Sequence, residues 1–497
     1  MRIRTWPLLI AGAVMLAGCG TAVVNPVTGA TERTVMTEAD ELAEGRKAHA
    51  QVLAEYGAYE HPRLQAYVNA LGQRLARQSH RSQLPWTFTV LDSPEVNAFA
   101  LPGGYVYVTR GILAYLDSEA ELAGVVGHEI GHVTARHGAQ RATRQQQAGL
   151  GVLAAVVLGA VLEGSGVKGA TDLASQVSQG VAAGYIASYS REQELQADQL
   201  GAEYLVRNHY DPKNMVDVIG VLKNQERFAA DVATAEGRSA PAGANWLSSH
   251  PSNDQRLADI GRIAAGYVGE YGDDGRARYL QAIDGMQFGE SRAQGVTRGR
   301  QFLHETLDIA LTAPVGWQVR NGAQAIAVVN GAGDAGLVLR LVPAGAGSTH
   351  EEILRKLVQP TEGRSERRSL NGLAATQFTG MRRNAQGQAQ ALRLTVVTGP
   401  GNRHFLLQPA ARDGTALQRA AAGLAEAEGS FRALTAADRA LARPWVLKTV
   451  PFPRGGFAEL ARSSPLTSQA EGHLRLINSA YGGGVEPRPG QLVKVVQ

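Results

Sequence analysis

The sequence predicts a mainly α-helical first domain with a small β-sheet, followed by an α+β region. Residues 38–55 and 61–79 place apolar side chains at three- and four-residue spacing, which is typical of amphipathic helices, and Ser118 is predicted to cap a further helix. Residues 86–93 and 105–109 are rich in β-branched and aromatic residues, which favours short strands. In the second half, strand-like runs alternate with glycine and proline turns, so a mixed region is expected there.

The N-terminus has the pattern of an export signal. Arg2 and Arg4 precede an apolar run over residues 6–17 that is too short to span a bilayer. The run ends in LAGC, which resembles the bacterial lipobox and implies cleavage before Cys19, the only cysteine, and its lipidation. By the same resemblance, Gly20 after the cysteine favours the outer membrane. The alternative is a buried N-terminal helix with an incidental cysteine.

Composition narrows the class of function. The chain has 49 basic and 45 acidic residues with no long run of either, so nucleic-acid binding is not indicated.

Residues 19–36 are mostly small and polar, and we expect them to form a tether. Residues 150–162 are apolar but fall short of the roughly 20 residues that a membrane span needs. A buried helix and a surface that rests on lipid both remain open for them.

The stretch HEIGH is the main candidate for a catalytic site. On a helix, His128 and His132 point in nearly the same direction, so their imidazoles can close on one ion, and neutral imidazole suits zinc. Glu129 is placed to act as general base on a water at the metal. Gly127 and Gly131 each cost about 1 kcal/mol in a helix interior, which suggests close packing or binding here. Alone, the pattern does not separate a metal site from coincidence.

A second predicted helix carries a matching pair of acids. Glu194 and Asp198 are four residues apart and share one helix face. Glu194 can supply a third ligand, and Asp198 can accept the outer N–H of a ligand histidine, as carboxylates near metal sites usually do. The alternative is an ordinary solvated helix face. The histidine pair earlier in the chain favours the metal interpretation.

Four motifs together resemble one family. NAFALPGGYVYVTRGIL, HEIGHVTARH, SREQELQADQLG and SSHPSNDQRL are similar to the zinc metallopeptidases that include the HtpX heat-shock protease, the CAAX prenyl endopeptidase and the periplasmic beta-barrel assembly-enhancing protease. The resemblance covers about residues 35–270. It implies a zincin-type fold of the gluzincin class, with one Zn²⁺ per subunit held by His128, His132 and Glu194, and with Glu129 activating the water.

The fourth motif contains His250 and Arg256. A loop could carry His250 into the site, where its N–H would stabilise the oxyanion of the reaction and make it a catalytic residue. Alternatively, His250 occupies the open fourth position of the zinc and holds the enzyme shut. Arg256 is expected to anchor this loop through an ion pair, with Asp198 or with a group near Glu129. His137 is expected to be structural.

The first motif suggests how a substrate binds. An extended peptide can add to a strand edge through main-chain hydrogen bonds. By resemblance, the segment that lies over the zinc cleft comprises Asn97, Ala98, Phe99 and Ala100. An ordinary core strand is an equal alternative.

The second half carries no recognisable chemistry. Residues 300–435 are predicted to form an α+β domain of unknown role, with a short helix at 350–358 and strands near 390–398 and 403–408. The tail resembles a divergent LysM-type module, with a strand, two short helices and a closing strand. This resemblance implies possible contact with peptidoglycan, and a plain packing or partner domain is the alternative.

These observations divide the chain into five segments. The expected segments are a lipoprotein signal peptide over 1–18, a tether over 19–36, a zinc metallopeptidase domain over 37–290, an α+β domain over 300–435 and a small LysM-like module over 440–497.

The sequence thus predicts a zinc-dependent endopeptidase anchored by lipid in the bacterial cell envelope, on the periplasmic face of the outer membrane. Its expected substrates are unfolded or misassembled envelope proteins, which is a role in protein quality control. Two rivals remain open. One is a chaperone or scaffold for envelope proteins with latent proteolysis, and the other is a peptidoglycan-associated tether.

Overall fold

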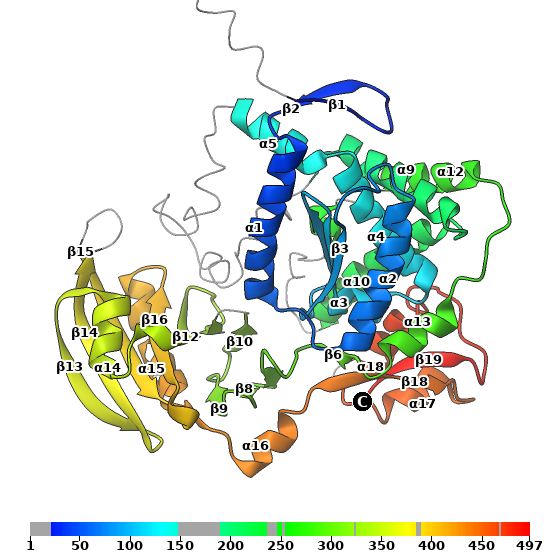
Figure 1. The fold of residues 1–497 in the computed structure, drawn as a ribbon. Coiled ribbons are helices and arrows are strands. Elements are labelled where there is room, and N and C mark those ends of the chain that lie inside the picture. Colours follow the sequence, from blue (N-terminus) through cyan, green and yellow to red (C-terminus); the bar gives the residue numbers. More distant parts are fainter. Residues whose placement is uncertain are drawn as a thin grey trace, which may run out of the picture.

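The computed structural model describes residues 21–147, 189–235, 246–250, 254–322, 325–383, 389–466 and 469–497. Cys19, for which we expect lipidation, lies outside these ranges, as do residues 150–162, for which a buried helix and contact with lipid were both open. In Figure 1 the helices of the first half lie to the right of the sheet region coloured yellow, and the C-terminal elements lie below them in red. Within the described ranges, no helix has both the length and the apolar character that crossing a bilayer requires.

The first half is built from helices around a three-stranded sheet. The helices are α1 (Glu38–Tyr56), α2 (Pro62–Arg77), α3 (Arg110–Tyr115), α4 (Glu119–Thr134), α5 (His137–Gln147), α9 (Arg191–Arg207), α10 (Asn214–Ala235), α11 (Trp246–Ser249), α12 (Asp254–Gly266) and α13 (Arg276–Ile283). The sheet has the order β3 (Thr87–Leu91), β5 (Tyr105–Thr109), β4 (Ala98–Leu101), with β3 and β5 parallel and β4 antiparallel to β5. The helices and strands predicted for this part are therefore confirmed.

The N-terminal hairpin consists of β1 (Thr21–Val24) and β2 (Thr31–Thr34), which pair in antiparallel register. It lies within the segment that we expected to be a tether. It contacts α5, because the hydroxyl of Thr143 accepts a hydrogen bond from the backbone N–H of Val35 at 2.9 Å.

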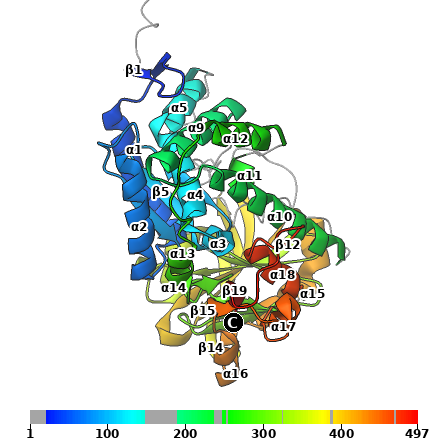
Figure 2. The same ribbon diagram turned by 90° about the vertical axis from the view of Figure 1, so that its right-hand side faces the viewer.

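Helix α4 is the central element of this half. The side chain of Ser118 accepts a hydrogen bond from the N–H of Glu121, which confirms the predicted cap, and every residue of the helix is buried. Figure 2 shows α4 between α1 and α2 on one side and α9 to α12 on the other. A helix that is buried on all sides can present polar groups only to an internal site.

Helices α4 and α9 approach closely because glycines face their contact. A Cβ on Gly131 would lie 2.8 Å from the carbonyl oxygen of Ala197, and a Cβ on Gly201 would lie 3.1 Å from the backbone nitrogen of His128. The first distance leaves no room for a side chain, and the second is tighter than most Cβ contacts in proteins. The close packing expected from the glycines of the HEIGH helix is thus a helix–helix contact, and it brings the two acids of α9 to the histidines.

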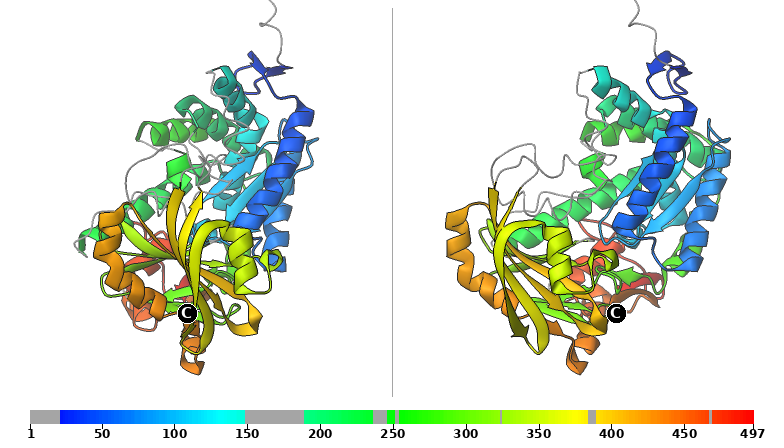
Figure 3. Two further views of the ribbon diagram at one scale, coloured as in Figure 1. Left: turned by 90° about the vertical axis from the view of Figure 1, so that its left-hand side faces the viewer. Right: turned by 60° about the vertical axis from the view of Figure 1, so that its left-hand side comes forward.

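A seven-stranded antiparallel sheet dominates residues 300–435. Its order is β10 (Gln318–Asn321), β11 (Ile326–Val329), β12 (Ala335–Leu341), β16 (His404–Ala411), β15 (Ala389–Thr398), β14 (Leu373–Arg383), β13 (Pro360–Leu370). One face packs on α15 (Gly414–Gly429) and the other on α14 (His350–Ile353) and the π-helical turn Leu354–Val358, as Figure 3 shows. A smaller sheet joins β7 (Val296–Arg298), β8 (Gln301–His304), β9 (Ile309–Thr312) and β17 (Arg432–Ala433), and α16 (Ala436–Leu441) follows it.

The tail folds as a strand, two helices and a strand, in the order predicted. These elements are β18 (Trp445–Pro451), α17 (Gly456–Ala461), α18 (Ala470–Ile477) and β19 (Leu492–Val496), and β6 (Gln287–Phe288) joins β18 to complete a three-stranded sheet. Phe457, Leu474 and Val493 belong to the same buried apolar cluster as Leu113 and Val125 of the first half. The tail therefore packs into the core that surrounds α4.

A buried lysine joins the tail to the start of α4. Lys494 is fully buried, and its ammonium group donates to the carbonyls of Leu116 and Ala114 at 2.6 and 3.2 Å and lies 3.0 Å from the carboxylate of Asp117. Burial alone would raise the pKa of Asp117, but Lys494 and Arg276 lower it. The ion pair thus keeps a charged carboxylate inside the core.

We expect Lys494→Met to destabilise the protein by about 3 kcal/mol, because breaking a buried pair leaves the remaining charge without its main partner. Urea unfolding followed by tryptophan fluorescence measures this loss. Lys448→Met is the matched control, since Lys448 is 40% exposed in its pair with Asp284 and such pairs contribute about 0–1 kcal/mol. Equal losses in the two variants would contradict the role of Lys494.

Candidate metal centre

Four side chains from three segments converge inside the first half. His128 and His132 come from α4, Glu194 comes from the first turn of α9, and His250 follows α11. All four are buried, and one ligand atom from each lies within 4.8 Å of the others. The Nε2 atoms of His128 and His132 are 3.0 Å apart, and the carboxylate oxygens of Glu194 lie 3.5 Å and 3.4 Å from them. The three ligands predicted from sequence are thus brought together.

The cluster fits a zinc ion in its spacing and its charge. In a tetrahedral zinc site the ligand atoms are about 3.4 Å apart, since the bonds are about 2.1 Å long. The observed separations bracket this value. In addition, the buried carboxylates of Glu194 and Asp198 pair with one guanidinium, that of Arg256, and the buried carboxylate of Glu129 lies beside His250. With neutral imidazoles these four groups carry a formal charge of −2, which a divalent cation balances.

His250 supplies a fourth donor to the cluster. Its Nδ1 lies 3.1 Å from Nε2 of His128 and 3.0 Å from a carboxylate oxygen of Glu194, and its Nε2 lies 3.4 Å from the carboxylate of Glu129. In this arrangement His250 occupies the ligand cluster itself.

Trp246 is a site residue that the sequence analysis missed. Its indole N–H donates to Oε1 of Glu129 at 3.0 Å, and its backbone N–H donates to the carbonyl of Val96 at 2.7 Å. Its ring stacks on that of His250, with centroids 4.7 Å apart. Helix α11 therefore closes over Glu129. The sequence contained a signal for this role, because Trp246 lies one helical turn before His250.

Asp198 and Arg256 form a buried support for the cluster. Oδ1 of Asp198 lies 2.8 Å from Nδ1 of His128, and the guanidinium of Arg256 donates two hydrogen bonds to the same carboxylate, each 2.8 Å long. Arg256 also donates to the carbonyl of His250 at 2.9 Å and lies 2.8 Å from Glu194. Of the two partners considered for Arg256, the structure pairs it with Asp198. The pair anchors both the ligand histidine and the loop that carries His250.

The buried charges shift the pKa values of the site in opposite directions. Burial alone would raise the pKa of Asp198 and of Glu194, but Arg256 lowers that of Asp198, and the neighbouring histidines hold that of Glu194 well below its usual range. Burial disfavours a charged His128, yet the hydrogen bonds that its ring donates to the carboxylates of Asp198 and Glu194 raise its pKa to about 9. Burial and His128 hold the pKa of His132 far below normal. Metal binding requires the neutral form of both imidazoles.

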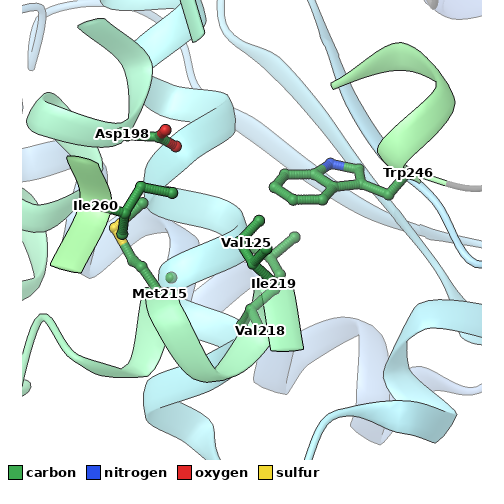
Figure 4. Close-up of a pocket in the computed structure, with 8 residues that line it drawn as sticks. Val125, Asp198, Met215, Val218, Ile219, Trp246 and Ile260 are labelled. Atoms are coloured by element: carbon green, nitrogen blue, oxygen red, sulfur yellow. The ribbon is translucent and has the colours of Figure 1, made fainter. Parts of the chain in front are cut away.

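A small, mostly apolar cavity lies behind the cluster, with Asp198 and Trp246 on opposite sides of it (Figure 4). The lining residues are Gly124, Val125, Asp198, Met215, Val218, Ile219, Trp246 and Ile260. This apolar surround keeps water from the Asp198 carboxylate and strengthens its hydrogen bonds.

The predicted substrate segment packs beside α4. Asn97, Ala98, Phe99 and Ala100 are all buried, and Ala98–Leu101 forms β4, an edge strand of the three-stranded sheet. The carbonyl of Val96, just before this segment, accepts the hydrogen bond from the backbone N–H at the start of α11. Their side chains thus belong to the core, while α11 engages the main chain at the start of the strand.

Two further residues contact the ligand His132. Nδ1 of His137 lies 2.8 Å from Nδ1 of His132, and the ring of Tyr189 stacks on His132 with centroids 3.9 Å apart. Tyr189 directly precedes the cap of α9, a position at which no sequence pattern drew attention to it. Both contacts restrict the rotation of the His132 ring.

Comparison with known proteins identifies the domain that holds this cluster. Residues 62–264 match the model of peptidase family M48, and this range contains all four cluster residues. The chain carries a peptidase family M48 domain. The resemblance drawn from the four sequence motifs is confirmed, and zinc is the metal that the M48 family implies.

Relatives that match the part of the chain around the M48 domain include bacterial proteases and mitochondrial metalloendopeptidases. The "Beta-barrel assembly-enhancing protease" of Yersinia pestis is 31% identical over 238 residues, 47% of this chain and 46% of that protein. The protein of the same name from Escherichia coli K12 is 29% identical over 252 residues, 50% and 48% of the two chains. The mitochondrial metalloendopeptidase OMA1 of Schizosaccharomyces pombe is 33% identical over 218 residues, 43% and 58%. The chain spans about half the length of these curated relatives.

We expect Asp198→Asn to weaken zinc binding by about 10- to 100-fold, because the outer partner that orients His128 loses its charge. Competition with a chromophoric zinc chelator measures the dissociation constant. Asp259→Asn is the control, since Asp259 makes exposed contacts with Gln255 and Arg262 on α12. A dissociation constant for Asp198→Asn equal to that of wild type would exclude this role.

Proposed function

We propose that this protein is a zinc-dependent endopeptidase of the cell envelope that hydrolyses peptide bonds of unfolded or misassembled envelope proteins. The buried cluster of His128, His132 and Glu194 beside Glu129 is the observation that carries the proposal. The family match and the endopeptidase relatives support the same reaction.

Each residue of the site has a separate role in the proposed hydrolysis. His128, His132 and Glu194 would hold zinc, which when bound polarises a peptide carbonyl and makes water more acidic. Glu129 accepts a proton from the attacking water and returns it to the leaving amine. Its Oε2 is buried and accepts no hydrogen bond from the described residues, so it is free for this proton. Asp198 and Arg256 keep His128 and the His250 loop in position.

His250 and α11 control access in this proposal. His250 lies among the metal ligands, and the indole N–H of Trp246 donates a hydrogen bond to the carboxylate of Glu129. The His250 contact would have to open before a substrate carbonyl and water could enter, and the Trp246 contact holds Oε1 of Glu129. This arrangement supports the interpretation of His250 as a latch over the catalytic role that would place its N–H at the oxyanion. After opening, main-chain pairing of substrate with the strand from Asn97 to Ala100 is the binding mode we propose.

The envelope setting comes from the sequence and from relatives. Lipidation at Cys19 would anchor the chain to the periplasmic face of the outer membrane. The name of the Yersinia pestis relative refers to beta-barrel assembly, which supports envelope proteins as the substrate class. The strand, two helices and strand of the tail support a LysM-like module, for which peptidoglycan contact is the proposed role.

We expect Glu129→Gln to lower casein hydrolysis by at least about 100-fold while zinc content stays at one per chain, because the general base is lost and the ligands remain. Glu192→Gln, at an exposed glutamate of α9, should cleave casein like wild type. Removing the metal with 1,10-phenanthroline should stop cleavage, and added zinc should restore it. A wild-type protein without zinc would refute the proposal. Equal holding of an unfolded client by wild type and Glu129→Gln, with no cleavage by either, would instead favour the chaperone.

We expect His250→Ala to raise casein hydrolysis by at least about tenfold, because an open state that is populated at 10% or less becomes the main one. Trp246→Phe tests the second contact, since phenylalanine keeps an aromatic ring but lacks the N–H that donates to Glu129. A smaller rise in casein hydrolysis is expected for this variant. Zinc content should not change in either variant. A fall in activity for His250→Ala would assign His250 to the oxyanion instead.

A further inference from the structure

A chain of buried hydrogen bonds leads from His132 to the N-terminal hairpin. Nδ1 of His132 lies 2.8 Å from Nδ1 of His137, and Nε2 of His137 lies 3.1 Å from Oε1 of Gln196. The same oxygen of Gln196 accepts from the side-chain amide of Asn25 at 3.0 Å. All four side chains are buried, so water does not compete for these bonds.

A metal bound at Nε2 of His132 would fix the direction of the two histidine bonds in this chain. A neutral imidazole carries one N–H, so when Nε2 of His132 faces the metal its Nδ1 carries the hydrogen. That N–H donates to Nδ1 of His137, whose own hydrogen must then be on Nε2 and donate to Gln196. The Gln196 oxygen can accept from both His137 and Asn25, because an amide oxygen has two lone pairs. The bonds that start at His132 and the bond from Asn25 therefore converge on the Gln196 oxygen.

The turn between β1 and β2 fixes the amide group of Asn25. Its Oδ1 accepts hydrogen bonds from the backbone N–H groups of Val27 and Thr28 at 2.9 and 3.2 Å. Its Nδ2 also donates to Glu32 on β2 at 2.9 Å, and the other oxygen of Glu32 accepts from Gln140 of α5. Because the oxygen is held by the turn, the amide N–H groups of Asn25 face Gln196 and Glu32.

The two metal-binding histidines of α4 are thus oriented differently. His128 is held directly by the carboxylate of Asp198. His132 is held by the imidazole of His137, which is in turn fixed by Gln196 and by the hairpin. The orientation of His132 therefore depends on residues 21–34, which lie outside the part of the chain that matches the M48 model.

We propose that the N-terminal hairpin is part of the metal centre and that Asn25 is a positioning residue, which orients His132 through Gln196 and His137. This inference rests on the proposed function in one respect, namely that zinc occupies the cluster. A hairpin that leaves α9 removes the Asn25 bond and loosens His132. Metal affinity and the docking of the hairpin are consequently linked.

The test measures zinc affinity and ligand geometry in the full chain. Asn25→Asp keeps an oxygen for the turn but cannot donate to Gln196, and we expect it to weaken zinc binding by about threefold to tenfold. His137→Phe should weaken it by about 10- to 100-fold. Thr28→Ala is the control within the same hairpin, because the side chain of Thr28 accepts a local bond from the N–H of Ala30, and alanine keeps the backbone N–H that donates to Asn25. It should bind zinc like wild type.

Two further measurements separate positioning from general stability. The visible absorption of the cobalt-substituted protein should change in Asn25→Asp and not in Thr28→Ala, because it reports ligand geometry. Asn25→Asp should also have no further effect on zinc affinity in a His137→Phe background, since the link to His132 is already cut. Wild-type zinc affinity and an unchanged cobalt spectrum in Asn25→Asp would overturn the inference, as would additive effects in the double variant. A wild type that binds no zinc would refute the proposed function as well.

Discussion

The buried ion pair between Arg256 and Asp198 is the interaction on which the metal centre depends. Buried charges are stabilising only when their hydrogen bonds are complete. Here the bonds that complete the pair also orient the site, because Asp198 continues to His128 and Arg256 continues to the carbonyl of His250. Three segments far apart in the chain are thereby held to one point. The requirement to satisfy two charges inside the core sets the positions of a ligand and of the loop that covers it.

Much of the M48 domain follows from local rules. The cap at Ser118, the shared face of His128 and His132, and the shared face of Glu194 and Asp198 depend on residues at most four positions apart. Such spacing is fixed by helix geometry alone. Gly131 is an intermediate case. The free-energy cost of glycine inside a helix predicts that another group packs closely against Gly131. The identity of that group, helix α9, is set by tertiary packing and cannot be predicted from local sequence.

The contacts that could not be predicted join residues separated by long stretches of chain. The bond from Trp246 to Glu129 spans 117 residues, that from Asn25 to Gln196 spans 171, and that from Lys494 to Leu116 spans 378. Each involves one side chain in a locally ordinary segment, so no periodicity marks it. The segment expected to be a tether shows the same effect. Its small polar composition gives no sign that a turn would present the Asn25 amide to α9.

The position of β19 in the sequence has a consequence for when the core around α4 is completed. Val493 and Lys494 complete the core around the start of α4, yet the ribosome reaches them some 380 residues after Ala114, which Lys494 contacts. Until then, Asp117 has no cation from the tail and the adjoining apolar core is open. Synthesis of the metal-binding helix therefore precedes its stabilisation by hundreds of residues. The core around α4 can be completed only after Lys494 has been made.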